Sequence, residues 1–315
     1  MGRTGAVVLY RETIAEFRAA PKARPFYFLV TMTPTVRRAK QRFMVLPDSL
    51  IDSVVPDIIR DVARSEILPR FNNLSDPEIS EKTVGDVVTI ADERAEAALT
   101  ERLSALLPGS LVVGEEAVDR DAGGLRALAE DGPVWVIDPL DGTLNFAGGL
   151  PIFAVMVACL IGGRPVASWI YDPVHDRMAR AQAGGGSYLD DKRIRFDPPT
   201  DLARMTGVVH TRFGDRDLAA TLARASGKLA SVLVLHCAGF EYLAMLHGRI
   251  TFSIYHRGYA WDHLPGLLLV EEAGGHLRRI DGSPYRATDH ALAVPFIAAG
   301  SEACWETVRV AFFTE

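Results

Sequence analysis

Residues 134–151 read VWVIDPLDGTLNFAGGLP, an apolar strand that runs directly into two aspartates, Asp138 and Asp141. A tight turn would account for Asp-Pro and Asp-Gly, because both pairs favour turns. It would leave the second aspartate, Thr143, and the aromatic residue and glycines that follow unexplained. The stretch therefore predicts a loop with a chemical role at the end of a buried strand.

The composition limits the class of protein. With 315 residues, 48% of them hydrophobic, the chain can bury one large core or two closely packed ones. No apolar run reaches the roughly 20 residues of a membrane span, so we expect no membrane partner. The net charge of -6 argues against nucleic-acid binding. Three widely spaced cysteines (Cys159, Cys237 and Cys304) favour neither disulfides nor a zinc site and indicate a reducing, cytoplasmic location.

The first 45 residues differ from the rest of the chain. They are rich in Arg and Lys, contain prolines and show no sustained hydrophobic period. We expect a poorly ordered basic extension over residues 1–45, which is either a transit peptide or an upstream reading frame with initiation at Met32 or Met44.

Helices and strands alternate irregularly after this extension. Helical spacing predicts helices over 48–70 and 91–107, and the segment 152–196 predicts a meander of strands separated by glycine-rich turns. Further strands and two helices follow, the last over 262–273. We expect an α+β fold with an N-terminal α+β half, residues 46–196, and a C-terminal α/β half, residues 197–315.

Acidic residues stand where several of these elements begin or end: Asp86, Glu115, Asp138, Asp141 and Asp262. Oxygen donors that converge on one pocket are what a hard divalent cation requires. We interpret Asp92 differently, as a helix cap.

Three motifs together resemble the inositol monophosphatase family of metal-dependent phosphatases. They are GEE at 114–116, WVIDPLDGTLNF at 135–146 and AWDHLPGLLLVEEAGG at 260–275. The resemblance runs from about Asp48 to the C-terminus. It implies a layered αβαβα sandwich of the inositol monophosphatase and sugar phosphatase type, and a homodimer.

The resemblance also implies two or three Mg²⁺ ions in each active site. Glu115, Asp138 and the backbone carbonyl of Leu140 would bind the first. Asp138 would bridge to a second, which Asp141 and Asp262 complete. Two carboxylates and one carbonyl from a single loop would explain the spacing of the opening motif.

Phosphate would bind to the backbone N–H groups of Gly142 and Thr143. The resemblance implies that Thr143 and Asp86, with Glu115 in the catalytic set, orient an attacking water on the metal, without a phosphoenzyme. Glu116 would support the site from behind or lie on the surface.

The implied activity is hydrolysis of a small alcohol phosphate similar to inositol monophosphate. Histidinol phosphate, a sugar phosphate or a 3'(2'),5'-bisphosphate nucleotide are alternative substrates within the family, and a binding module without turnover is a further alternative. The separation of Asp138 from Asp141 disfavours a haloacid-dehalogenase-like mechanism, and Leu140 breaks an EF-hand loop.

Substrate-binding positions depart from the inositol-type pattern. Where that pattern has Gly-Ser/Thr-Ala, this chain has His236-Cys237-Ala238, and where it has a glutamate this chain has Tyr255. We expect these residues to contact the alcohol and to weaken inositol recognition. His256 and His263 are interpreted as structural.

Overall fold

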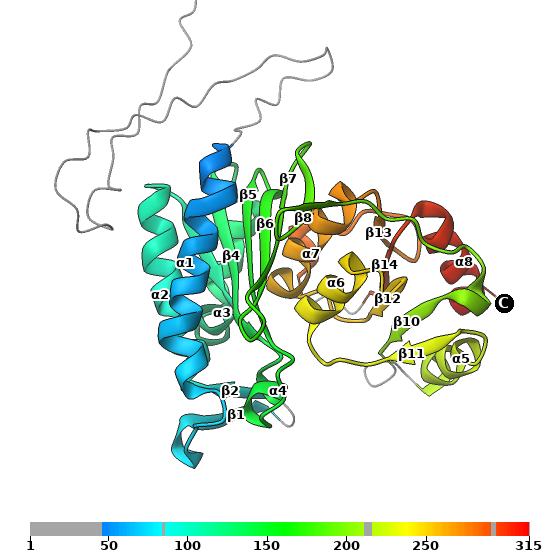
Figure 1. The fold of residues 1–315 in the computed structure, drawn as a ribbon, viewed down its shortest axis with the longest axis horizontal. Coiled ribbons are helices and arrows are strands. Elements are labelled where there is room, and N and C mark those ends of the chain that lie inside the picture. Colours follow the sequence, from blue (N-terminus) through cyan, green and yellow to red (C-terminus); the bar gives the residue numbers. More distant parts are fainter. Residues whose placement is uncertain (1–45, 84–85, 211–215, 291–293, 315) are drawn as a thin grey trace, which may run out of the picture.

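The computed structural model describes residues 46–83, 86–210, 216–290 and 294–314, so the extension predicted over residues 1–45 lies outside the described part. Five layers follow one another across the molecule (Figure 1): helices, a seven-stranded sheet, helices, a five-stranded sheet and helices. The predicted αβαβα sandwich is therefore confirmed.

The first sheet and its outer helices come from the N-terminal half. Its helices and strands are β1 (Ile79–Thr83), β2 (Asp86–Thr89), α1 (Val55–Val62), α2 (Ile90–Leu106), β3 (Leu111–Gly114), α3 (Glu115–Arg120), β4 (Pro133–Asp141), α4 (Thr143–Ala147), β5 (Ala154–Ile161), β6 (Arg164–Asp172), β7 (Arg177–Gln182), β8 (Gly186–Leu189) and β9 (Lys192–Ile194).

The seven-stranded sheet has the order β3-β4-β5-β6-β7-β8-β9. Strand β3 pairs parallel with β4, and each later strand pairs antiparallel with the one before it, which confirms the predicted meander. Helices α1 and α2 cover one face through a core that includes Trp135 and Trp169. The indole N–H of Trp169 donates to the carbonyl of Ile51, which ties the first helical turns to the sheet.

The C-terminal half supplies the second sheet and the other helices. Its elements are β10 (Thr206–Val209), α5 (Arg216–Ser226), β11 (Ser231–Leu233), α6 (Ala238–Leu246), β12 (Phe252–Tyr255), α7 (Ala260–Glu272), β13 (His276–Arg279), β14 (Phe296–Ala299) and α8 (Glu302–Phe313).

Helices α6 and α7 form the middle layer of the sandwich. The strands of the second sheet have the order β11-β10-β12-β14-β13. A single core cluster joins apolar side chains of α6 and α7 to the inner faces of both sheets, whereas α5 and α8 cover the outer face of the second sheet. Helix α7 is apolar around nearly its whole circumference because it is buried on both sides.

Two predicted elements differ in detail. The helix predicted over 48–70 consists of α1 flanked by π-helical turns at Leu50–Val54 and Ala63–Ile67, and Ser49 makes no side-chain cap. The apolar stretch SVLVLHC at 231–237 also predicts a strand, but β11 ends at Leu233, and as an edge strand it leaves its three residues exposed.

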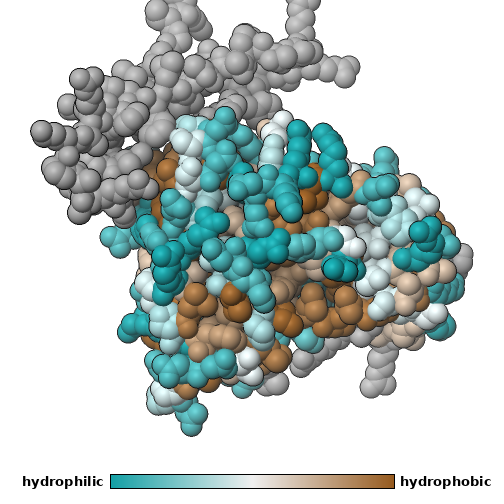
Figure 2. All heavy atoms as spheres, in the orientation of Figure 1, coloured by the Kyte–Doolittle hydropathy of each residue, from teal (hydrophilic) through white to brown (hydrophobic). Residues whose placement is uncertain are grey.

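Some apolar side chains are exposed on and near α4 and β11. Figure 2 shows hydrophobic surface on the lower part of the face in view. Leu144 and Leu150, in and just after α4, are 50% and 52% exposed, and Val232 and Val234, in and just after β11, are 41% and 45% exposed. Among the described residues, no helix is both long and apolar enough to span a bilayer.

Candidate active site

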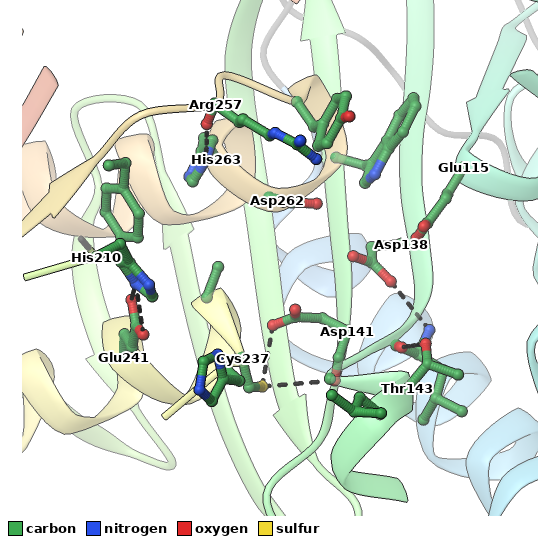
Figure 3. Close-up of a pocket in the computed structure, with 18 of the residues that line it drawn as sticks. Glu115, Asp138, Asp141, Thr143, His210, Cys237, Glu241, Arg257, Asp262 and His263 are labelled. Carbon is green, nitrogen blue, oxygen red and sulfur yellow. Dashed lines mark hydrogen bonds and ion pairs between the residues drawn. The ribbon is translucent and has the colours of Figure 1, made fainter. Parts of the chain in front are cut away.

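A cavity of about 430 Å³ lies where the two halves meet (Figure 3), walled by the starts of α3, α4, α6 and α7 and the ends of β4, β10 and β12. Its lining contains two groups of ionisable side chains, which adjoin where Arg257 extends over Asp262 (Figure 3). We call one group the acidic half: Glu115, Asp138, Asp141 and Asp262. We call the other the basic half: His210, His236 and Arg257.

A β-bulge in β4 brings the two aspartates of the opening motif to the same side. Asp138 pairs with Met156 of β5, but Asp141 pairs with Ala154, so three steps along β4 match two along β5. In a regular strand, residues three apart point to opposite faces. The extra residue restores the same face, and both carboxylates line the cavity.

Gly142 makes the turn from β4 into α4 possible. Its φ of +88° lies in the left-handed region, and an added Cβ would lie 2.8 Å from the carbonyl oxygen of Ile152. Both constraints demand glycine. The turn places Thr143 at the start of a helix that faces the cavity.

The remaining acids arrive from different parts of the chain. Glu115 begins α3 directly after β3, and Asp262 lies in the first turn of α7, from the C-terminal half. Lys82 neutralises part of this charge: its Nζ lies 3.7 Å from Glu115, 2.8 Å from Glu116 and also contacts Asp119. Sequence reasoning did not identify Lys82.

The acids of the acidic half disfavour one another's charged forms. Burial and then the neighbouring Glu115, Asp141 and Asp262 raise the pKa of Asp138 well above its usual range. Burial and Asp262 do the same to the pKa of Glu115. Among the described residues, no three His, Cys, Asp or Glu side chains are already gathered into a metal cage. A cation would relieve this repulsion.

Asp141 is held by the C-terminal half. Its Oδ2 accepts a hydrogen bond from the Gly239 N–H at 2.5 Å and from the Cys237 thiol at 3.0 Å. These bonds oppose the effect of burial, which raises the pKa of Asp141 to about 6. An added Cβ on Gly239 would lie 2.8 Å from the Ala154 Cβ, so only glycine permits this approach.

The residue that contacts Thr143 is Asp92, which corrects the interpretation of Asp92 as a helix cap alone. Oδ2 of Asp92 accepts from the backbone N–H of Thr89 and caps α2 as predicted, but Oδ1 lies 2.9 Å from Thr143 Oγ1. Thr143 Oγ1 also lies 2.9 Å from the Leu140 carbonyl oxygen. Burial raises the pKa of Asp92 to about 7. The Asp86 side chain lies outside the described residues, so its role stays a prediction.

The basic half contains a histidine fixed by a buried carboxylate. Nε2 of His210 lies 3.0 and 3.2 Å from the two carboxylate oxygens of Glu241, which is fully buried. Burial alone would lower the pKa of His210, but this hydrogen bond and the Glu241 charge raise it. The ring stacks at 5.8 Å on Tyr255, which is only 5% exposed.

A second histidine holds the segment that carries Arg257. His263 Nε2 donates to the carbonyl of Arg257 at 2.8 Å, and its Nδ1 accepts from Tyr242 at 3.1 Å. Burial lowers the pKa of His263 to about 3, so the ring is neutral and structural, as predicted. Figure 3 shows the Arg257 side chain extending across the cavity above Asp262.

The structure brings almost all the predicted site residues together. Those that line the cavity are Glu115, Asp138, Leu140, Asp141, Gly142, Thr143, His236, Cys237, Ala238, Tyr255 and Asp262. Sequence reasoning missed His210, Glu241 and Arg257. His210 and Glu241 are 31 residues apart, and no motif marks any of the three.

Comparisons with known proteins agree with this site. The model of the inositol monophosphatase family matches residues 54–306. An inositol-1-monophosphatase of Mesorhizobium japonicum is 32% identical over 67% of this chain and 79% of its own length. Inositol monophosphatase 2 of Solanum lycopersicum is 32% identical over 68% of this chain and 83% of its own length.

The fold also matches solved structures. The structure of a Thermotoga maritima IMPase superimposes with a TM-score of 0.69 at 24% identity, covering 81% of this chain and 94% of that one. This likeness supports the fold, and the family match and the relatives extend over most of the described chain. The chain therefore belongs to the inositol monophosphatase family and is a phosphomonoesterase of that type.

Proposed function

We propose that this protein hydrolyses a small alcohol phosphate with Mg²⁺ and a directly attacking water. The observation that supports this most is the β4 bulge, which turns Asp138 and Asp141 into the cavity beside Glu115 and Asp262. The neighbouring acids help to raise the pKa of Glu115 and of Asp138, and such mutual repulsion fits a site that cations complete.

The donor set suits Mg²⁺ rather than a softer metal. Glu115, Asp138, Asp141 and Asp262 offer carboxylate oxygens, and Leu140 can add its carbonyl; hard oxygen donors are what Mg²⁺ prefers. When bound, Mg²⁺ ions lower the pKa of water and neutralise phosphate charge. We propose two or three ions in each site.

Thr143 and Asp92 are the residues we propose to handle the proton of the attacking water. Thr143 has one hydroxyl proton but two neighbouring acceptors, Asp92 Oδ1 and the Leu140 carbonyl. When the hydroxyl donates to Asp92, Oγ1 can accept a proton from water. Asp92 can then take the threonine proton, because burial raises its pKa to about 7.

The backbone N–H groups of Gly142 and Thr143 are the proposed phosphate contacts. They stand at the start of α4, where the first N–H groups of a helix have no partner within it. Both residues line the cavity beside the acidic half. The phosphate would then lie between these donors and the metal ions.

A phosphate-release screen tests the proposal. We would assay inositol 1-phosphate, histidinol phosphate, fructose 1,6-bisphosphate and phosphoadenosine phosphate, with Mg²⁺ and after exhaustive chelation. We expect release from at least one compound that disappears on chelation and returns with Mg²⁺. Release that is unchanged by chelation, or none from any phosphomonoester, would exclude this function.

We also propose a cytoplasmic homodimer. The exposed apolar residues Leu144, Leu150, Val232 and Val234 are candidates for the subunit contact, and the three cysteines are free and buried, as in a reducing compartment. Sedimentation of the parent and of Leu150→Glu tests the dimer. We expect twice the monomer mass for the parent and a shift towards monomer for the variant.

A further inference from the structure

The basic half presents hydrogen-bond donors to the cavity. Arg257 and His236 are exposed, and the His210 side chain is 15% exposed. The acceptor on this side, Glu241, is fully buried and both its oxygens face His210. A polyol hydroxyl both donates and accepts, so its proton would lack an acceptor here, whereas an anionic group only accepts and therefore matches these donors.

His236 is held in a strained conformation at the edge of this group. Its φ of +53° lies in the left-handed region that favours glycine. Such strain persists where surrounding structure imposes it, and it often marks functional positions. Its carbonyl lies 3.4 Å from the side-chain nitrogen of Asn145, and its ring centroid lies 6.5 Å from that of His210.

Arg257 is the only permanently cationic residue among the described residues that line the cavity. His263 fixes its backbone through the Arg257 carbonyl. The segment is therefore anchored from inside while the guanidinium extends over the cavity, as Figure 3 shows. A guanidinium can contact two oxygens of an anion at once.

We propose that the substrate is a phosphomonoester whose alcohol carries a second anionic group, and that Arg257, His210 and His236 bind this group. This inference rests on the proposed function, since the acidic half must first take the phosphate that is hydrolysed. The second anion would be a phosphate or a carboxylate, and both accept hydrogen bonds from the same donors.

Two matched pairs of substrates distinguish a second phosphate from a carboxylate. Fructose 1-phosphate is compared with fructose 1,6-bisphosphate, and glycerol 2-phosphate with glycerate 2-phosphate, at saturating Mg²⁺. We expect a higher kcat/KM for the member with the extra anion in at least one pair. The pair that responds identifies phosphate or carboxylate.

Variants then show which residues cause the preference for the substrate with the extra anion. Arg257→Gln should lower the ratio of kcat/KM values within the responding pair by about tenfold to a hundredfold, the worth of one charge-assisted hydrogen bond. Arg257→Lys should retain part of the ratio because it keeps the charge. His210→Gln, which preserves a donor to Glu241, should lower the ratio less. Arg249→Gln, an exposed arginine that does not line the cavity, is the matched control.

His236→Gly distinguishes binding from folding. Glycine adopts the observed φ without strain, so the variant should not lower Tm, yet it should lower the same ratio. A ratio near one in both pairs, or a ratio that Arg257→Gln leaves unchanged, would overturn the inference. Failure of every phosphomonoester tested would instead overturn the proposed function.

Discussion

The acidic and basic halves of the cavity carry charge in opposite ways. In the acidic half, like charges face one another, and burial with their neighbours raises the pKa of Glu115 and Asp138. In the basic half, His210 is paired with Glu241. The acidic half is thus stabilised by adding cations, whereas in the basic half Glu241 balances the charge of His210. This difference fits the proposed division, in which the acidic half supports the chemistry and the basic half selects the substrate.

The largest expected effect follows from removing one carboxylate of the acidic half. Asp138→Asn should reduce Mg²⁺-dependent turnover by about a thousandfold or more, because the proposed shared ligand is lost. In chelator the variant should be no less stable than the parent, since one of several repelling charges has gone. Phosphate release and thermal unfolding measure the two effects.

Asp131→Asn is the matched control, because Asp131 is exposed just before β4. It should leave both quantities unchanged. Near-normal turnover in Asp138→Asn would remove Asp138 from the site.

A second test concerns the proton path at the edge of the acidic half. Thr143→Val should lower kcat by about a hundredfold, as expected for the loss of a proton-transfer group, and Thr143→Ser should keep most of it. Asp92→Asn should lower kcat similarly and also weaken the α2 cap, by about 1 kcal/mol of unfolding free energy. Equal rates for the Val and Ser variants would contradict the role given to the hydroxyl.

The pH dependence of stability gives a third test. Burial raises the pKa of Asp92 from 3.8 to about 7 and that of Asp141 from 3.8 to about 6. At pH values between the unfolded and the folded pKa, Asp92 and Asp141 therefore keep their protons in the folded protein but lose them in the unfolded chain. This stabilisation is complete below about pH 4 and is lost as pH rises through 6 to 7.

We accordingly expect the chelated protein to have a lower Tm at pH 8 than at pH 6.5. His263 has the opposite effect, because burial lowers its pKa from 6.5 to about 3. The stability that it contributes therefore rises with pH, and most of this rise is complete by pH 6.5. Mg²⁺ should raise Tm more at pH 8, where the acids are ionised. A larger effect of Mg²⁺ at pH 6.5 would contradict the carboxylate site.

The smallest expected effect is in the wall of the basic half. The Tyr255 hydroxyl is buried without a hydrogen-bond partner among the described residues, so Tyr255→Phe should be neutral or stabilising. We expect the preference between inositol 1-phosphate and an aryl phosphate to change by less than about tenfold, the worth of one neutral hydrogen bond. Tyr255→Glu, which would restore the glutamate of the inositol-type pattern, is a poorer test of this position because it would bury a second acid near Glu241. A larger shift would give Tyr255 a direct role in substrate selection.

The acidic and basic halves of the cavity also differ in how many of their residues the sequence predicts. Asp138, Asp141 and Gly142 lie close together at the end of β4, and local patterns with the family resemblance are enough to locate them. His210 and Glu241 are 31 residues apart, and only the packing of β10 against α6 brings them together. Asp92 was assigned one role because its cap explained it fully. The sequence could not show that its second oxygen faces Thr143.

The hydrogen bond from Gly239 to Asp141 has a consequence for synthesis of the chain. Residues 46–196 leave the ribosome first and contain Glu115, Asp138 and Asp141, but the amide that holds Asp141 and the fourth acid, Asp262, arrive later. Domains generally fold as units, and N-terminal ones fold first during synthesis. A nascent or truncated chain that ends before α6 therefore lacks both Gly239 and Asp262, and the proposed metal site is complete only after the last third of the polypeptide has docked.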